Sequence, residues 1–355
     1  VLAAMAWRQT ACWRNAETLW THTIACTDKN LLALYNLAFT YVEEGRTDEA
    51  IACLREAVTA DSIDPQLMAK SHCLLADGLA KQGKVDEALA EYEQAERIYP
   101  ASSVFHDRLA KEFRRRGNYD RAIAEWREVV RLQPQQLRGR MGLADALLAH
   151  GETAAAIAEC QEVLAQDPFA IQANLVLGEA LATEGKAEEA IGPLKRALDV
   201  QADNAQAHFH LGVVLYDLNR SRVALEHLEQ AIHLQPDNVE IVRQTAWILA
   251  TSPDATVRDG TRAVELAARA VQLSAGQDWR AFDAEAAALA ETGQFPLAIE
   301  AAQQASALAM AGGDAASVAA IEQRMRQYRQ ALPYRRPAPP KAGQAPVGQA
   351  PQAPD

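Results

Sequence analysis

The sequence lacks the patterns by which catalytic and metal-binding sites are usually recognised. Its five cysteines are odd in number and none stands in a CxxC spacing, so neither a disulfide framework nor a zinc site is expected. It has no GxGxxG or GxxxxGK(S/T) phosphate loop, no HExxH and no GxSxG. We therefore predict that the chain is not an enzyme and that it has no catalytic residue, no cofactor and no metal ion.

Positive charge and aromatic rings are also scarce. Lys and Arg number 35 against 47 Asp and Glu, which gives a net charge of −12. Proteins that bind nucleic acids generally need an excess of positive charge to neutralise phosphates, so no nucleic-acid partner is expected. Aromatic residues make up 6% of the chain while apolar residues make up 49%, a balance that suits thin, alanine-rich helices.

What the sequence does have is a 34-residue period between Ser103 and Asn238. Each unit carries a turn residue, a small residue five positions after it and a leucine eight positions before it. The turn residues are Gly117, Gly151, Gly185 and Asn219; the small residues are Ala122, Ala156, Ala190 and Ala224; the leucines are Leu109, Leu143, Leu177 and Leu211. A fixed period of this length is typical of repeat proteins in which each unit is one supersecondary motif.

The residue types in the unit explain why it should form a helix pair. The leucine belongs to an apolar stripe on a first helix, and the turn glycine allows the left-handed backbone that ends this helix. The small residue keeps the second helix thin where the two cross, and a proline such as Pro134 or Pro168 ends it. One pair cannot bury its own stripe, so neighbouring pairs must stack. The predicted fold class is all-α, an α-α superhelix.

This unit resembles the tetratricopeptide repeat (TPR), and the same alignment extends in both directions. It predicts a TPR solenoid of about eight helix pairs over residues 31–311, followed by a capping helix over 312–332 that begins at Asp314. Residues 333–355 contain seven prolines and almost no large apolar residue, so we expect a disordered tail there. Residues 1–30 fit a degenerate N-terminal half-repeat and also the end of a membrane helix.

The start of the chain carries a second resemblance. The stretch from Trp7 to Trp20, together with the one from Ala250 to Pro253 and Arg258-Asp259-Gly260, resembles the C-terminal TPR region of bacterial membrane glycosyltransferase-like proteins. These are similar to the transmembrane-and-TPR mannosyltransferases. The resemblance implies membrane attachment through a segment N-terminal to Val1, with the repeats on the extracytoplasmic (periplasmic) side. The basic Arg8 and Arg14 favour the cytoplasmic alternative by the positive-inside rule.

Two functional classes follow from these resemblances. The first is a non-catalytic scaffold that binds a peptide or partner protein in the concave groove of the repeats. The second is a substrate-presenting accessory region of a protein glycosyltransferase, which in O-GlcNAc transferase carries an asparagine ladder at repeat position 6. Position 6 here reads Asn36, Leu74, Arg108, Gly142, Val176, His210 and Gln244. Because the ladder is missing, the scaffold is the favoured reading.

The residues that face the groove in such repeats predict one candidate site. Residues 103–140 hold ten basic and five acidic residues, and an apolar stretch precedes them, so the sequence favours an extended acidic peptide as partner. The candidate groove residues are Tyr35, Phe39, Arg108, Lys111, Arg114, Arg115 and Arg138. The alternative is that these cations only pair with acids on neighbouring helices. A second candidate location comprises Gln206, Phe209, Tyr216 and Trp247.

Overall fold

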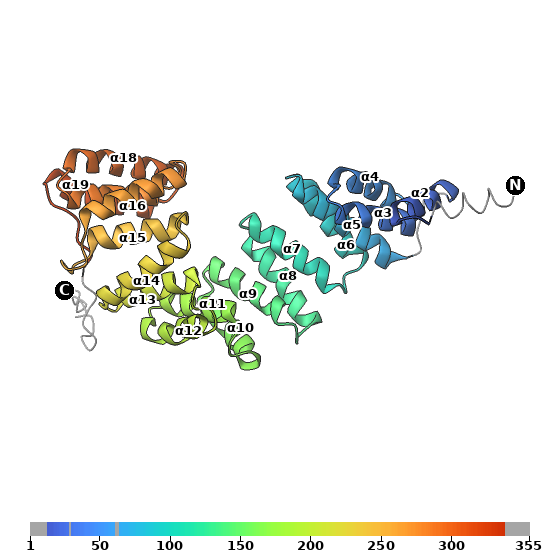
Figure 1. Cartoon of the computed structure of the whole chain (residues 1–355), viewed down its shortest axis with the longest axis horizontal. Helices are drawn as coiled ribbons and strands as arrows, with labels where there is room; N and C mark the ends of the chain where they lie inside the picture. Colours follow the sequence, from blue (N-terminus) through green and yellow to red (C-terminus); the bar gives the residue numbers. More distant parts are fainter. Residues whose placement is uncertain (1–12, 28–29, 61–63, 338–355) are drawn as a thin grey trace, which may run out of the picture. The chain divides into compact units, whose positions relative to one another are not determined.

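The structure is a computed structural model that describes residues 13–27, 30–60 and 64–337. Within these residues it contains 18 α-helices and no β-strand, so the prediction of an all-α fold is confirmed (Figure 1). Neighbouring helices pack against one another from α2 to α9 and from α11 to α19. They belong to two compact units, Val1–Glu159 and Cys160–Asp355, with the boundary inside α10.

The helices of the two units follow the 34-residue period. Unit 1 contains α2 (Ala16–Cys26), α3 (Leu31–Glu43), α4 (Thr47–Ala57), α5 (Pro65–Lys81), α6 (Val85–Ile98), α7 (Ser103–Arg115), α8 (Tyr119–Leu132), α9 (Leu137–His150) and the start of α10 (Thr153–Gln166). Unit 2 contains α11 (Ile171–Thr183), α12 (Ala187–Val200), α13 (Ala205–Asp217), α14 (Ser221–Leu234), α15 (Val239–Thr251), α16 (Gly260–Leu273), α17 (Trp279–Glu291), α18 (Phe295–Ala311) and α19 (Ala315–Arg329). The odd-numbered helices from α3 to α17 are the first helices of their pairs, called A helices below.

The core of unit 1 is built from the positions that the repeat pattern marks as apolar or small. Leu109 and Ala122 are fully buried, and Leu143 is almost so. Larger side chains between the helix pairs, among them Tyr92 and Trp126, complete one continuous cluster. Because each pair contributes its stripe to the same cluster, the core runs along the stack instead of closing within one pair.

The turn residue ends the A helix by the left-handed backbone that the sequence predicts. The φ angles of Gly117, Gly151 and Gly185 are 71°, 90° and 77°, and Asn219 adopts the same region with a φ of 59°. Asparagine tolerates this conformation better than most residues, which explains how it replaces glycine in this one unit. Elsewhere, glycine permits close approach: a Cβ atom on Gly142 would lie 2.4 Å from Nε1 of Trp126.

In unit 2 the last helix covers the end of the stack. Ile321, Met325 and Tyr328 of α19 are buried against the alanines of α18. Asp314 accepts a hydrogen bond from the backbone N–H of Ser317 and so caps the start of α19. Arg324 of α19 reaches α17, where it donates two hydrogen bonds to the buried carboxylate of Asp283 at 3.1 and 2.6 Å.

The structure differs from the sequence expectation directly after this helix. Disorder was expected from residue 333, yet residues 333–337 pack against α13, α15 and α17 through both side-chain and main-chain contacts. The rest of the expected tail, residues 338–355, lies outside the described residues, as does the expected membrane-helix end in residues 1–12. Of the helices that the structure describes, none combines the length and apolar content needed to cross a membrane.

Candidate functional site

Unit 1 contains a groove of about 530 Å³ that is lined by residues of α3, α4, α5, α6 and α7. The residues that line it are Val42, Thr47, Leu74, Asp77, Gly78, Ala80, Lys81, Tyr92, Arg108 and Arg115. We call this surface the N-terminal groove. It combines apolar side chains with two of the predicted arginines, so it offers both contact area and positive charge.

Asp77 organises the polar part of the N-terminal groove. Its carboxylate accepts a hydrogen bond of 2.5 Å from the Tyr92 hydroxyl and lies 3.3 Å from a guanidinium nitrogen of Arg108. Burial and the neighbouring Asp77 raise the pKa of Tyr92, so the hydroxyl keeps its proton and remains a donor. Arg108 is thereby held over the groove while nearly half of its side chain stays exposed.

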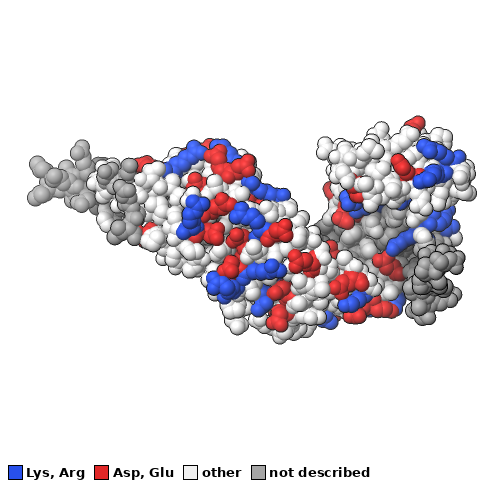
Figure 2. All heavy atoms as spheres, turned by 180° about the vertical axis from the view of Figure 1, so that it is seen from behind, with Lys and Arg blue, Asp and Glu red and all other residues white. Residues whose placement is uncertain are grey.

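The other predicted cations differ in whether they form an ion pair. Lys111 pairs with Asp107 on the same helix at 2.5 Å, and Arg115 pairs with the buried Glu112 at 3.3 Å. Arg114 and Arg138 are exposed and form no ion pair with any other described residue. Figure 2 shows that basic and acidic side chains are interspersed on the visible face of unit 1.

The predicted aromatic residues lie on α3 beside this site. The rings of Tyr35 and Phe39 are stacked with their centroids 6.5 Å apart. Tyr35 also packs against the core, whereas Phe39 is 43% exposed. Neither lines the N-terminal groove, which Val42 of the same helix does. The structure therefore places an exposed aromatic pair on one lining helix and two of the five predicted cations in the groove itself.

Eight of the ten lining residues are not among the sequence-based candidates; they include Leu74, Asp77 and Tyr92. Leu74 and Asp77 occupy repeat positions 6 and 9 of α5, the same positions as Arg108 and Lys111 one repeat later. Applying the groove positions to this repeat as well would have identified both. Tyr92 comes from α6, a second helix, and the groove positions of the A helices carry no signal for it.

A second polar feature recurs inside the helix pairs with the period of the repeat. A side chain near the start of the A helix contacts a side chain 19 residues later on the second helix. The contacts are His72–Glu91 at 2.6 Å, His106–Glu125 at 2.7 Å, Arg140–Glu159 at 2.8 Å and, in unit 2, His208–His227 at 2.9 Å. We call these contacts the intra-repeat polar ladder. Between the third and fourth of them, Pro193 holds the second-helix position, and Asn174 bonds to Arg196 instead.

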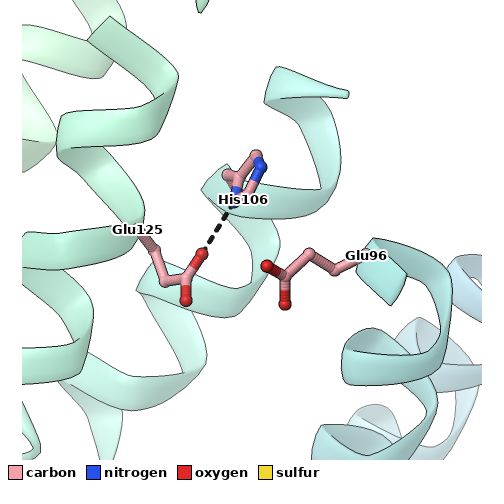
Figure 3. Close-up of side chains that lie close together, drawn as sticks. All are labelled: Glu96, His106 and Glu125. Carbon is pink, nitrogen blue, oxygen red and sulfur yellow. Dashed lines mark hydrogen bonds and ion pairs between the residues drawn. The ribbon is translucent and has the colours of Figure 1, made fainter. Parts of the chain in front are cut away.

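The His106 contact is the most enclosed member of the ladder (Figure 3). Nδ1 of His106 faces the Glu125 carboxylate and Nε2 lies 2.9 Å from the backbone oxygen of Pro100. When both ring nitrogens donate to these acceptors, the ring is an imidazolium. The hydrogen bond that His106 donates to Glu125 raises the pKa of His106 despite its burial.

Glu96 brings a second carboxylate to this cluster from α6. The ligand atoms of Glu96, His106 and Glu125 all lie within 4.8 Å of one another, a donor set of the kind that divalent cations accept. Burial, followed by the charge of Glu125, raises the pKa of Glu96. Sequence reasoning missed the cluster because the three residues lie on three helices with no metal-ligand spacing. In the protonated ring the two N–H groups donate to Glu125 and to the Pro100 oxygen, so neither ring nitrogen is then available to a metal ion.

The second candidate location from the sequence divides into two parts in unit 2. Gln206 and Phe209 line a cavity of about 230 Å³ together with the acidic Glu179 and Glu240. The rings of Tyr216 and Trp247 lie elsewhere and are contacted by residues 333–337. The structure therefore does not bring these four residues into one site.

Comparison with known proteins identifies the repeat. Models of the tetratricopeptide repeat match residues 30–101, 108–171, 178–219 and 205–238, which together are more than half of the chain. The chain belongs to the tetratricopeptide-repeat family. This confirms the TPR resemblance and the α-α solenoid that it implies. None of the curated protein sequences compared with this TPR protein matches it significantly.

Solved structures agree with the TPR fold. The C-terminal part of a TPR repeat-containing protein from Cytophaga hutchinsonii matches with a TM-score of 0.51 and 16% identity, over 64% of this chain and 92% of that one. The pilF protein of Pseudomonas aeruginosa matches with a TM-score of 0.49 and 20% identity, over 61% and 96%. YrrB, described as a TPR protein with an unusual peptide-binding site, matches with a TM-score of 0.42 and 19% identity, over 58% and 96%. At these identities the likeness concerns the fold alone.

Proposed function

We propose that this TPR protein is a scaffold that holds an extended acidic segment of a partner protein along the N-terminal groove. TPR proteins are generally non-catalytic and bind proteins or peptides. The observation that carries the proposal is the groove itself, in which Arg108 and Arg115 stand beside apolar side chains from α3 and α5. Of the other predicted cations, Lys111 and Arg114 lie on α7, as Arg108 and Arg115 do, and Arg138 lies on α9.

The charge balance at the groove favours an acidic ligand. Asp77 is the acidic residue of the lining; Arg108 balances its charge, and the Tyr92 hydroxyl donates a hydrogen bond to it. A guanidinium has five N–H donors, so Arg108 can keep its contact with Asp77 and still bind a carboxylate of the partner. The side chain of Arg115 is 70% exposed, which leaves most of its donors accessible.

The apolar anchors of the partner have a place beside these charges. Leu32 and Phe39 of α3 are among the exposed large apolar residues of the protein, with 53% and 43% exposure. Aromatic anchors commonly supply much of the binding energy at protein interfaces. A segment that places apolar side chains on α3 and carboxylates near α7 would therefore use both parts of the surface.

A pair of matched variants tests the proposal. Arg108→Gln with Arg115→Gln removes two positive charges from the groove, whereas Arg127→Gln with Arg131→Gln removes two from α8, outside it. The probe is a fluorescein-labelled peptide that alternates Glu with Leu and Phe, and anisotropy reports its binding. We expect the groove variant to bind about tenfold or more weakly, and the control variant to bind as the parent does.

Two further readings decide the outcome of this experiment. Binding should weaken as NaCl is raised, since the contact depends on exposed charges. Equal losses in the two variants would show a non-specific charge effect, and unchanged binding in the groove variant would place the site elsewhere. Circular dichroism melting of both variants establishes that neither loss reflects unfolding.

For location, we propose a membrane-associated protein whose repeats lie on the extracytoplasmic side. The support is the resemblance of the stretch from Trp7 to Trp20 to the junction of membrane glycosyltransferase-like proteins. The same resemblance supports the second candidate function, a substrate-presenting region of a protein glycosyltransferase. Carbonate extraction of membranes and protease protection in intact cells test the location. Release of the protein by carbonate, or protection from external protease after outer-membrane permeabilisation, would contradict it.

A further inference from the structure

Residues 333–337 have no regular secondary structure and contact the A helices of unit 2. We call this stretch, Pro-Tyr-Arg-Arg-Pro in sequence, the return segment. Its contacts reach α15, α17 and α13, the A helices of three successive repeats. A stretch with no helical structure of its own is thus held by the surface that it crosses.

Tyr334, the aromatic residue of the return segment, packs against side chains of α15 and α19. Tyr334 lies against Trp247 with ring centroids 5.8 Å apart. The guanidinium of Arg324 lies 5.3 Å from the Trp247 ring and 5.6 Å from the Tyr334 ring. Asp283 fixes Arg324 through two hydrogen bonds. The surface that contacts Tyr334 is therefore held in position by residues outside the return segment.

Each of the two arginines in the segment meets an acid. Arg335 pairs with Glu291 at the end of α17, and Arg336 pairs with Asp217 at the end of α13 at 2.9 Å. Arg336 also lies over the Tyr216 ring, 5.3 Å from its centroid. The two carboxylate oxygens in these pairs are shielded from solvent. A carboxylate oxygen shielded in this way is stabilised by a positive partner.

The main chain of the segment is recognised as well. The backbone N–H of Arg336 donates a hydrogen bond of 2.9 Å to the backbone oxygen of Thr251, the last residue of α15. An aromatic anchor, two matched charges and a main-chain hydrogen bond are the contacts by which folded domains hold extended peptides. They differ from the contacts of the N-terminal groove, where the charge of the receptor is positive.

We propose that the surface formed by Tyr216, Asp217, Trp247, Thr251 and Glu291 is a second peptide-binding site, specific for an extended partner segment with an aromatic residue followed by two arginines. The return segment occupies this site as an internal pseudo-ligand. A partner with the same chemistry binds by displacing it. This inference is independent of the N-terminal groove, which lies in unit 1 and selects the opposite charge.

The return segment fills the second site because it is covalently tethered to it. A ligand joined by a short linker has an effective concentration on the order of millimolar, so even a weak intrinsic affinity keeps the site filled. A partner in solution must bind more tightly, or be presented at high local concentration, to replace it. The return segment therefore raises the affinity threshold for partners and keeps weak, non-specific basic segments out.

The experiment uses the full chain and a labelled synthetic peptide with the sequence of residues 331–337. Tyr334→Ser with Arg335→Ser and Arg336→Ser empties the site, and this protein is the open variant. We expect the peptide to bind the open variant about tenfold or more tightly than it binds the parent, because the parent carries the competitor in cis. A peptide with Glu in place of both arginines is the matched control and should bind neither protein.

Two outcomes would overturn the proposal. One is equal binding of the peptide to the parent and the open variant, and the other is equal binding of the parent peptide and the Glu peptide to the open variant. Asp217→Asn with Glu291→Gln, added to the open variant, should abolish binding. If the open variant does not fold, Arg336→Ser alone is used; it removes one ion pair and should still admit the peptide more tightly than the parent does.

Discussion

His208 and His227 of unit 2 face each other with their Nδ1 atoms 2.9 Å apart. Nε2 of His208 lies 3.0 Å from the backbone oxygen of Ala202, to which it donates. One nitrogen of the facing pair must donate and the other must accept, so the hydrogen bond does not survive protonation of both rings. Burial, followed by the charge of His208, lowers the pKa of His227.

The first prediction is that acidification weakens unit 2 at this repeat. The folded pKa of His227 lies below its unfolded value, so the unfolded state takes up the proton more readily, and stability is lost as the pH falls below about 6.5. Urea unfolding at about pH 7.5 and about pH 5.5, followed in parent and His227→Gln, measures this. We expect a smaller loss of stability on acidification in the variant; equal losses would show that the pair does not control the effect.

The second prediction concerns His106, which occupies the same repeat position in unit 1 but faces Glu125. Its folded pKa is raised, so its contribution to stability is present below about pH 6.5 and is lost as the pH rises through the folded value. NMR titration of the imidazole should give a pKa above the ordinary value in the parent. Glu125→Gln, which removes the charge and keeps the size of the side chain, should lower it. A pKa unchanged in the variant would contradict the assignment of Glu125 as the main cause.

The third prediction is that Ala156→Leu destabilises the protein by about 1–3 kcal/mol through overpacking. Ala156 is fully buried at the repeat position reserved for a small residue. Ala158 on the same helix is exposed, so Ala158→Leu is the matched control and should change stability little. Denaturant unfolding compares them. A parent-like midpoint for Ala156→Leu would mean that this helix crossing has room to spare.

The fourth prediction concerns the buried pair of Asp283 and Arg324. Removing one partner leaves an uncompensated buried charge, so Arg324→Met should cost about 3–5 kcal/mol. Asp283→Leu combined with Arg324→Met should recover much of that loss, because neither charge remains. Denaturant unfolding of the single and double variants gives the coupling between the two residues. Additive losses would show that the ion pair is not the source of the cost.

The sequence predicts those structural positions at which the same residue type recurs in each repeat. Leu109, Ala122 and Gly117 recur as the same residue type every 34 positions, and the structure uses them as the pattern predicts. The intra-repeat polar ladder recurs at the same two positions of four repeats, but its members are His, Arg and Glu in varying combinations. When a contact recurs in successive repeats but is made by different residue types, a comparison of the repeat sequences does not detect it.

The candidate site and the end of the chain show a second limit. Groove positions of one A helix identified Arg108 and Arg115, but Tyr92 comes from a second helix and enters the groove only through the packing of α6 against α5. Residues 333–337 have the composition of a disordered tail, and composition describes what a segment can bury alone. Their partners Asp217, Trp247 and Glu291 are distant in sequence, so only the folded unit shows them.

The return segment also changes how the end of the TPR array can open. In a stack of repeats that contact only their neighbours, the terminal repeat frays first and at low cost. Here Arg335 and Arg336, which follow α19, pair with residues of α17 and α13, so α19 cannot detach without also breaking contacts one and three repeats back. Displacement by a partner peptide would remove this latch, and amide protons of α17, α18 and α19 would then exchange faster with solvent. Faster amide exchange in these three helices would therefore report that the ligand has bound.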